Sequence, residues 1–81
     1  MTGAYDCYGE ARRVSATMRD EGFGPDAQAL EDAIAAGFTS SEILMALRWH
    51  LDRFLEAKPE GSSTLRRSAK DLRNRIDAAL A

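Results

Sequence analysis

The sequence predicts an all-α protein, a small up-and-down helical bundle of four helices in which the second helix is short and the third helix is central. Glycine and proline divide the chain into four segments, and apolar residues recur in them three and four positions apart, as on one face of a helix. No segment shows the alternation of apolar and polar residues that is typical of a strand. A chain of 81 residues has room for one hydrophobic core, so we expect a single domain over residues 1–81.

The first predicted helix spans about residues 4–21. Gly22 follows it, and glycine readily takes the left-handed conformation that ends many helices. Gly9 lies inside the segment and costs about 1 kcal/mol relative to alanine, which predicts fraying of the first turn and a half. The residues that share one sector of about 120° and should face the core are Ala4, Cys7, Tyr8, Ala11, Val14, Ser15 and Met18.

The second predicted helix is short and has a thin apolar face. Pro25 suits the first turn of a helix, because its missing N–H has no partner to lose there. The segment runs to Ala36 and stops at Gly37, after which Phe38 can turn toward the core. Its small side chains allow a neighbouring helix to approach closely; the apolar positions are Ala27, Leu30, Ala33 and Ile34.

The third predicted helix has the clearest start in the chain. Thr39 is its N-cap, and Glu42 three residues later completes a capping box, in which each side chain accepts a hydrogen bond from the other residue's backbone N–H. The helix should end near residue 57 or 58, because Pro59 disfavours helical geometry in the residue before it. One sector of about 120° holds the residues predicted to face the core, namely Ile43, Leu44, Leu47, Leu51, Phe54 and Leu55.

The last predicted helix, about Ser63 to Leu80, carries a narrow apolar seam and an excess of basic residues. Residues 1–61 contain 6 basic and 11 acidic side chains, whereas residues 62–81 contain 5 basic and 2 acidic ones. We therefore expect the basic last helix to pack beside acidic neighbours. The seam consists of Leu65, Ala69, Leu72, Ile76 and Ala79.

Met45 and Trp49 do not belong to the core stripe of the third helix. They lie one turn apart on nearly the opposite side, so this helix either packs on two sides within the bundle or leaves both residues exposed for a partner. An aromatic residue beside methionine, with charged residues around it, is typical of the centre of a protein interface. The predicted partner-binding residues are Met45, Trp49, Arg48, Asp52, Arg53 and Glu56.

No catalytic, metal-binding or cofactor-binding pattern is present in the sequence. His50 is the single histidine and Cys7 the single cysteine, fewer than the roughly four ligands of a structural zinc site. Neighbouring carboxylates such as Glu31 and Asp32 point about 100° apart on a helix and do not form an acid–base pair. We therefore expect a protein that is not an enzyme and uses no cofactor.

The sequence also predicts a cytoplasmic protein without a membrane segment. One cysteine cannot form an internal disulfide, and no apolar run approaches the roughly 18 residues needed to span a membrane. The first residues lack the basic and apolar blocks of a signal peptide.

Two functions from different classes are compatible with these patterns. The favoured one is a small non-enzymatic module that binds another protein, or a second copy of itself, in the manner of an immunity protein, antitoxin, inhibitor or adaptor. The alternative is a helix-turn-helix-like DNA-binding regulator, because residues 30–51 have that outline and Arg66, Lys70 and Arg73 form a basic strip. Arg48 is the only basic residue at the outward positions of the second helix in that outline, and the net charge is −2, so a protein partner is favoured over nucleic acid.

Overall fold

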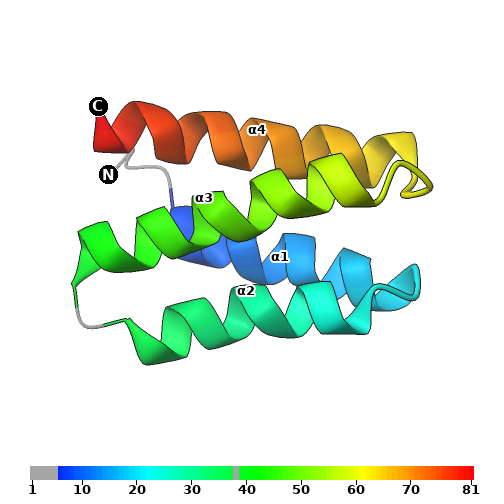
Figure 1. Ribbon diagram of the computed structural model, residues 1–81, viewed down its shortest axis with the longest axis horizontal. Coiled ribbons are helices and arrows are strands. Elements are labelled where there is room, and N and C mark those ends of the chain that lie inside the picture. Colours follow the sequence, from blue (N-terminus) through cyan, green and yellow to red (C-terminus); the bar gives the residue numbers. More distant parts are fainter. Residues whose placement is uncertain (1–5, 38) are drawn as a thin grey trace.

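The part of the chain that the structure describes, residues 6–37 and 39–81 of a computed structural model, forms four α-helices. These are α1 (Cys7–Asp20), α2 (Gly24–Ala36), α3 (Ser40–Ala57) and α4 (Ser63–Leu80). Successive helices run in opposite directions, so α1 and α3 point one way and α2 and α4 the other (Figure 1). The predicted all-α up-and-down bundle is confirmed.

The four helices pack as a closed ring. α1 contacts α2 and α4, and α3 contacts the same two helices from the other side of the bundle. The helix predicted to be central, α3, lies between α2 and α4, but every other helix also lies between two neighbours, so α3 is no more central than the others. The predicted short second helix has 13 residues and is nearly as long as α1, which has 14.

The core is formed by one face of each helix, as the apolar periodicity predicts, except that Ala79 of the predicted seam of α4 is exposed. Ser15 is the buried polar residue of the core, and the single proton of its hydroxyl is shared between the Arg12 carbonyl oxygen at 2.9 Å and Glu31 Oε2 at 3.2 Å. The largest buried apolar side chains of the described residues are Phe54, Met18, Leu30, Leu47, Leu51, Leu65, Leu72 and Ile76.

The N-terminus of α1 is capped by a side chain that the sequence analysis did not identify. Asp6 Oδ1 accepts a hydrogen bond from the Gly9 N–H at 2.9 Å. A Cβ atom on Gly9 would overlap the Asp6 carboxylate, so the glycine that we expected to weaken this turn leaves room for its cap. The predicted start of the helix at Ala4 lies outside the described residues.

The turn between α1 and α2 is a Schellman motif. Gly22 has a φ of 92°, the left-handed conformation predicted for it. Its N–H donates to the Arg19 carbonyl at 3.1 Å, and the Phe23 N–H donates to the Met18 carbonyl at 2.7 Å. The Phe23 ring then packs edge-on against Phe54 with ring centroids 5.3 Å apart, which ties the turn to the end of α3.

Local hydrogen bonds also set the starts of α3 and α4. Thr39 Oγ1 accepts from the Glu42 N–H at 3.2 Å, and Glu42 Oε1 accepts from the Thr39 N–H at 3.1 Å, which confirms the predicted capping box. Ser62 caps α4, and its own N–H and hydroxyl donate to Glu21 at 2.9 and 2.5 Å. Both bonds lower the pKa of Glu21 below its usual value, and the bond from the hydroxyl has the larger effect. The predicted inward turn of Phe38 lies outside the described residues.

Candidate functional site

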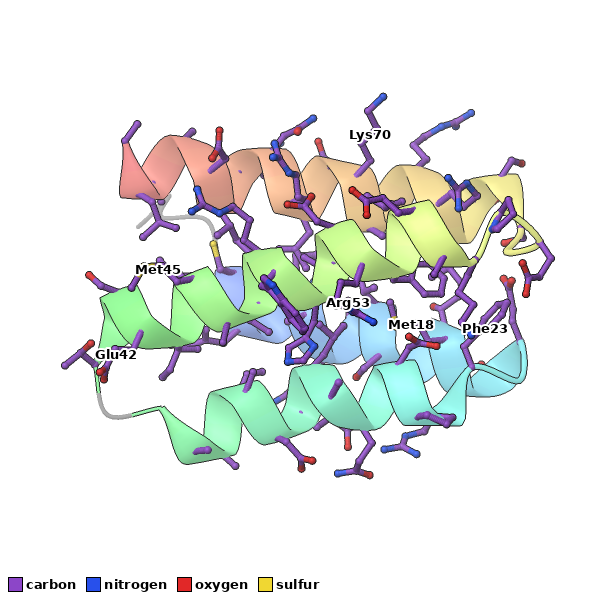
Figure 2. All side chains as sticks on the ribbon, viewed as in Figure 1. Met18, Phe23, Glu42, Met45, Arg53 and Lys70 are labelled. Carbon is purple, nitrogen blue, oxygen red and sulfur yellow. The ribbon has the colours of Figure 1, made fainter. Side chains whose placement is uncertain are left out.

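Met45 and Trp49 are exposed in the single chain. Their exposed fractions are 48% and 56%, and they are the exposed large hydrophobic side chains of the described residues. The sequence left open whether another helix of the bundle covers them, and the ring of helices leaves the outer side of α3 uncovered. Arg53, one turn after Trp49, is also exposed (Figure 2). The side chain of Glu56 is exposed as well. We call Met45, Trp49, Arg53 and Glu56 the Trp49 surface.

The indole ring of Trp49 is held in place by its neighbours on α3. The Arg53 guanidinium carbon lies 4.8 Å from the centroid of the indole, a cation–π arrangement. The imidazole of His50 meets the indole edge-on, with centroids 4.9 Å apart and an interplanar angle of 85°. A ring that is already oriented loses less conformational entropy when a partner covers it.

Arg48 and Asp52, the other two predicted partner-binding residues, are engaged with α4. Arg48 NH1 lies 2.6 Å from Asp77 Oδ1, and Arg73 Nε lies 2.8 Å from Asp52 Oδ1. Arg73 NH1 also lies 4.0 Å from Asp77, so the four charged groups form a chain across the two helices. The hydrogen bond with Asp52 is the main reason that the pKa of Arg73 is raised. The Arg73–Asp52 pair has the expected sense, a basic residue of the last helix beside an acidic neighbour, whereas the Arg48–Asp77 pair has the opposite sense.

Most of the predicted basic strip is used within the fold. The Arg66 guanidinium donates to the carbonyl oxygens of Lys58 at 2.7 Å and Leu55 at 2.9 Å, where α3 ends and its carbonyls lack helical partners. Lys70 is exposed and makes no hydrogen bond or ion pair with the other described residues (Figure 2). With Arg73 paired to Asp52, Lys70 is the one uncommitted cation of the three within the described part of the chain.

A shallow groove of small residues lies between α2 and α3. It has a volume of about 280 Å³ and is lined by Ala33, Ala36, Gly37, Glu42 and Ala46. Ala46 is also the neighbour of Met45 and lies one turn before Trp49, so the groove borders the Trp49 surface. Sequence reasoning missed this groove, although the alanines of α2 are the signal that could have indicated it.

Outside the Trp49 surface, the described residues hold no metal-binding cluster, and the pKa values of Cys7 and Glu31 are shifted. Among residues 6–37 and 39–81, no group of three or more His, Cys, Asp or Glu is placed to hold a metal ion. Cys7 is half-buried, and its pKa is raised by burial and by Asp6 against an opposing effect of Arg75. Glu31 has a lowered pKa, chiefly because Arg19 donates a hydrogen bond to it. No helix in the described part of the chain is long and apolar enough to cross a membrane.

Comparisons with known proteins give no functional assignment. No model of a known protein family, no curated protein and no solved structure matches the chain. The function is therefore inferred from the surface chemistry of the chain itself.

Proposed function

We propose that this chain is a small non-enzymatic protein-binding module that acts by occupying the surface of a partner protein. The observation that carries the proposal is the exposure of Trp49 and Met45 on the outer side of α3, at 56% and 48%. The type of protein is that of an immunity protein, antitoxin, inhibitor or adaptor, in which the contact surface itself is the functional element.

The composition of the Trp49 surface supports this role. Tryptophan, methionine and arginine are enriched at the centres of interfaces, and tryptophan and arginine are frequent among the residues that dominate binding energy. If an aromatic side chain offers about 200 Å², the 56% of Trp49 that is exposed would contribute about 3 kcal/mol when a partner covers it. One residue could therefore supply a large share of a weak or moderate affinity.

A structural role accounts for the charged groups whose pKa values are shifted. Glu21 binds Ser62, Arg19 binds Glu31, and Arg73 binds Asp52, so each shift comes from a contact between two elements of the bundle. Arg53 stacks on Trp49 and is the basic member of the Trp49 surface. The charged groups with shifted pKa values therefore hold the bundle together, and the Trp49 surface is left to bind a partner through its side chains.

The alternative of a helix-turn-helix DNA reader gains no support from the helix arrangement. The two helices of that motif cross at about 90–120°, whereas α2 and α3 run side by side in opposite directions (Figure 1). Arg66 and Arg73 also donate to groups within the bundle, which leaves Lys70 as the free cation of the strip among the described residues.

The test is binding to an identified protein and its dependence on Trp49. The tagged chain is expressed in its source organism, the retained proteins are identified, and one of them is purified for calorimetric titration. We expect Trp49→Ala to weaken its binding by about thirtyfold or more, the effect of losing a dominant interface residue. Arg67→Ala changes an exposed residue of α4 and serves as the matched control that should bind like the unaltered chain. Equal binding by the unaltered chain and Trp49→Ala contradicts the proposal, and so does a chain that retains no protein and does not bind a second copy of itself.

A further inference from the structure

We infer that the protein covering the Trp49 surface is a second copy of this chain, with the two α3 helices packed against each other in antiparallel orientation. This inference rests on the proposed function, because it requires the Trp49 surface to bind protein. Two features of the surface carry it. Together with the preceding turn of α3, which holds Glu42 and Ala46, the surface contains both a projecting side chain and a recess for it. In one register, Glu42 of each copy also faces Arg53 of the other.

The projecting side chain is Trp49, and the recess lies one turn earlier on the same helix. Residues spaced i, i+3, i+4 and i+7 form the hole into which a side chain of a facing helix inserts. On α3, Glu42, Met45, Ala46 and Trp49 have this spacing, and the small side chain of Ala46 leaves the middle of the hole open. The groove toward α2 continues the recess, because Ala46 also lines it.

A two-fold axis brings each projection to the other copy's recess. Surfaces that carry a projection and its matching recess side by side form isologous dimers, in which each contact occurs twice. In an antiparallel pair centred midway between residues 47 and 48, each Trp49 lies opposite Ala46 of the second copy. Both indoles are then covered by one interface.

Charge selects this register over the one in which the two indoles face each other. With the centre midway between residues 47 and 48, Glu42 of each copy lies opposite Arg53 of the other, which gives an opposite-charge contact at both ends. With the centre on Trp49, so that the two indoles face each other, Glu42 lies opposite Glu56 and like charges meet at both ends. Like charges that face each other cost free energy and disfavour a register.

Both charged residues are available for the contact. One carboxylate oxygen of Glu42 accepts the Thr39 N–H of the capping box, and its side chain is exposed. Arg53 is exposed and stacks its guanidinium on Trp49, and no ion pair holds it within the described part of the chain. In the dimer this stack places the guanidinium beside the buried indole, where Glu42 of the second copy can reach it.

The size of the surface predicts a weak dimer. A standard interface buries about 800 Å² of each partner, which is about one sixth of the 4920 Å² that this chain exposes. One face of α3 and the adjoining groove offer less than that, so self-association should be concentration-dependent. Measurements therefore have to extend from about 1 µM to about 1 mM, the range of weak affinities.

The decisive experiment uses two opposite charge reversals and their mixture. Glu42→Arg and Arg53→Glu each place like charges at both ends of a homodimer, so sedimentation should show self-association weakened by about tenfold or more in each variant alone. In an equimolar mixture, the two substituted side chains face each other at one end and the natural Glu42 and Arg53 face each other at the other end. Opposite charges then meet at both ends, and a heterodimer should form. Arg67→Glu makes the same charge change on α4 and should dimerise like the unaltered chain.

Two further measurements keep the test independent of folding defects. Circular dichroism reports whether Glu42→Arg, which loses its capping-box bond, retains the helix content of the unaltered chain. Quenching by acrylamide in the unaltered chain needs no variant, and the single tryptophan should be accessible in dilute solution and shielded near 1 mM.

Each result has one meaning. The dimer is overturned if the unaltered chain stays monomeric up to about 1 mM, or if the two folded variants do not associate when mixed. A monomeric chain that binds another protein through Trp49 refutes the dimer and leaves the proposed function standing. A monomeric chain without any partner that depends on Trp49 refutes both.

Discussion

Replacing Trp49 by alanine measures whether this side chain serves the fold or its surface. Trp49 is 56% exposed, so 44% of it is covered within the chain. For a side chain of about 200 Å², the covered part is about 90 Å² and contributes at most about 2 kcal/mol. Arg53 and His50 on the same helix supply part of this cover, and alanine favours a helix by up to about 0.7 kcal/mol. We therefore expect Trp49→Ala to lower the free energy of unfolding by about 1 kcal/mol.

The comparison is Leu51→Ala, two residues along the same helix. Leu51 is 0% exposed, and removing a buried leucine side chain lowers the free energy of unfolding by about 2–5 kcal/mol. Urea denaturation followed by the helical circular dichroism signal measures both variants without relying on tryptophan emission, at a concentration where the chain is monomeric. If Trp49→Ala costs as much as Leu51→Ala, the indole belongs to the core and the Trp49 surface is not available to a partner.

Three further predictions concern contacts that position the helices. A Cβ on Gly37 would overlap the Ile43 side chain, although the φ of −73° at Gly37 suits alanine. Urea denaturation should therefore show that Gly37→Ala costs about 1–3 kcal/mol in the natural chain and is neutral or stabilising when Ile43 is also alanine. An equal cost in both backgrounds contradicts the overlap. Because the pKa of Glu21 is lowered in the folded chain, its stabilising effect is complete above the unfolded value near 4.5 and is lost as the pH falls through the folded pKa. Thermal unfolding of Glu21→Gln should therefore lose less stability than the natural chain between about pH 6 and about pH 3, and equal losses count against the hydrogen bonds with Ser62. Arg66→Met keeps the apolar stem but loses two bonds to the end of α3, so denaturation should show about 1–2 kcal/mol less stability, and no change would mean that these bonds contribute nothing.

The helices and most of their ends were predictable because they depend on residues close in sequence. The capping box at Thr39 needs only Glu42, and the last helix begins at Ser63 and ends at Leu80 as predicted. The buried faces followed from periodicity, since the burial of Leu47 and Leu51 requires only that α3 has a core side. These features do not depend on which helices become neighbours.

The residues around the candidate site were predictable, but which of them contact α4 and which remain exposed was not. The sequence placed Arg48 and Asp52 beside Trp49, and the structure shows both engaged with α4. The groove beside Ala46 was also missed, because two of its five lining residues, Ala33 and Ala36, belong to α2. Both features depend on the side of α3 against which each neighbouring helix packs, which a helical pattern within one segment does not specify.

The sequence alone determined that α3 carries more apolar surface than one core stripe needs, because the angular positions of Met45 and Trp49 follow from helix geometry. Only the tertiary structure decided that these two side chains remain outside. In a ring of four helices each helix has two neighbours, and α2 and α4 both contact α3 on the sides that flank its core stripe. The opposite side, where Trp49 lies under Arg53, is left exposed to solvent.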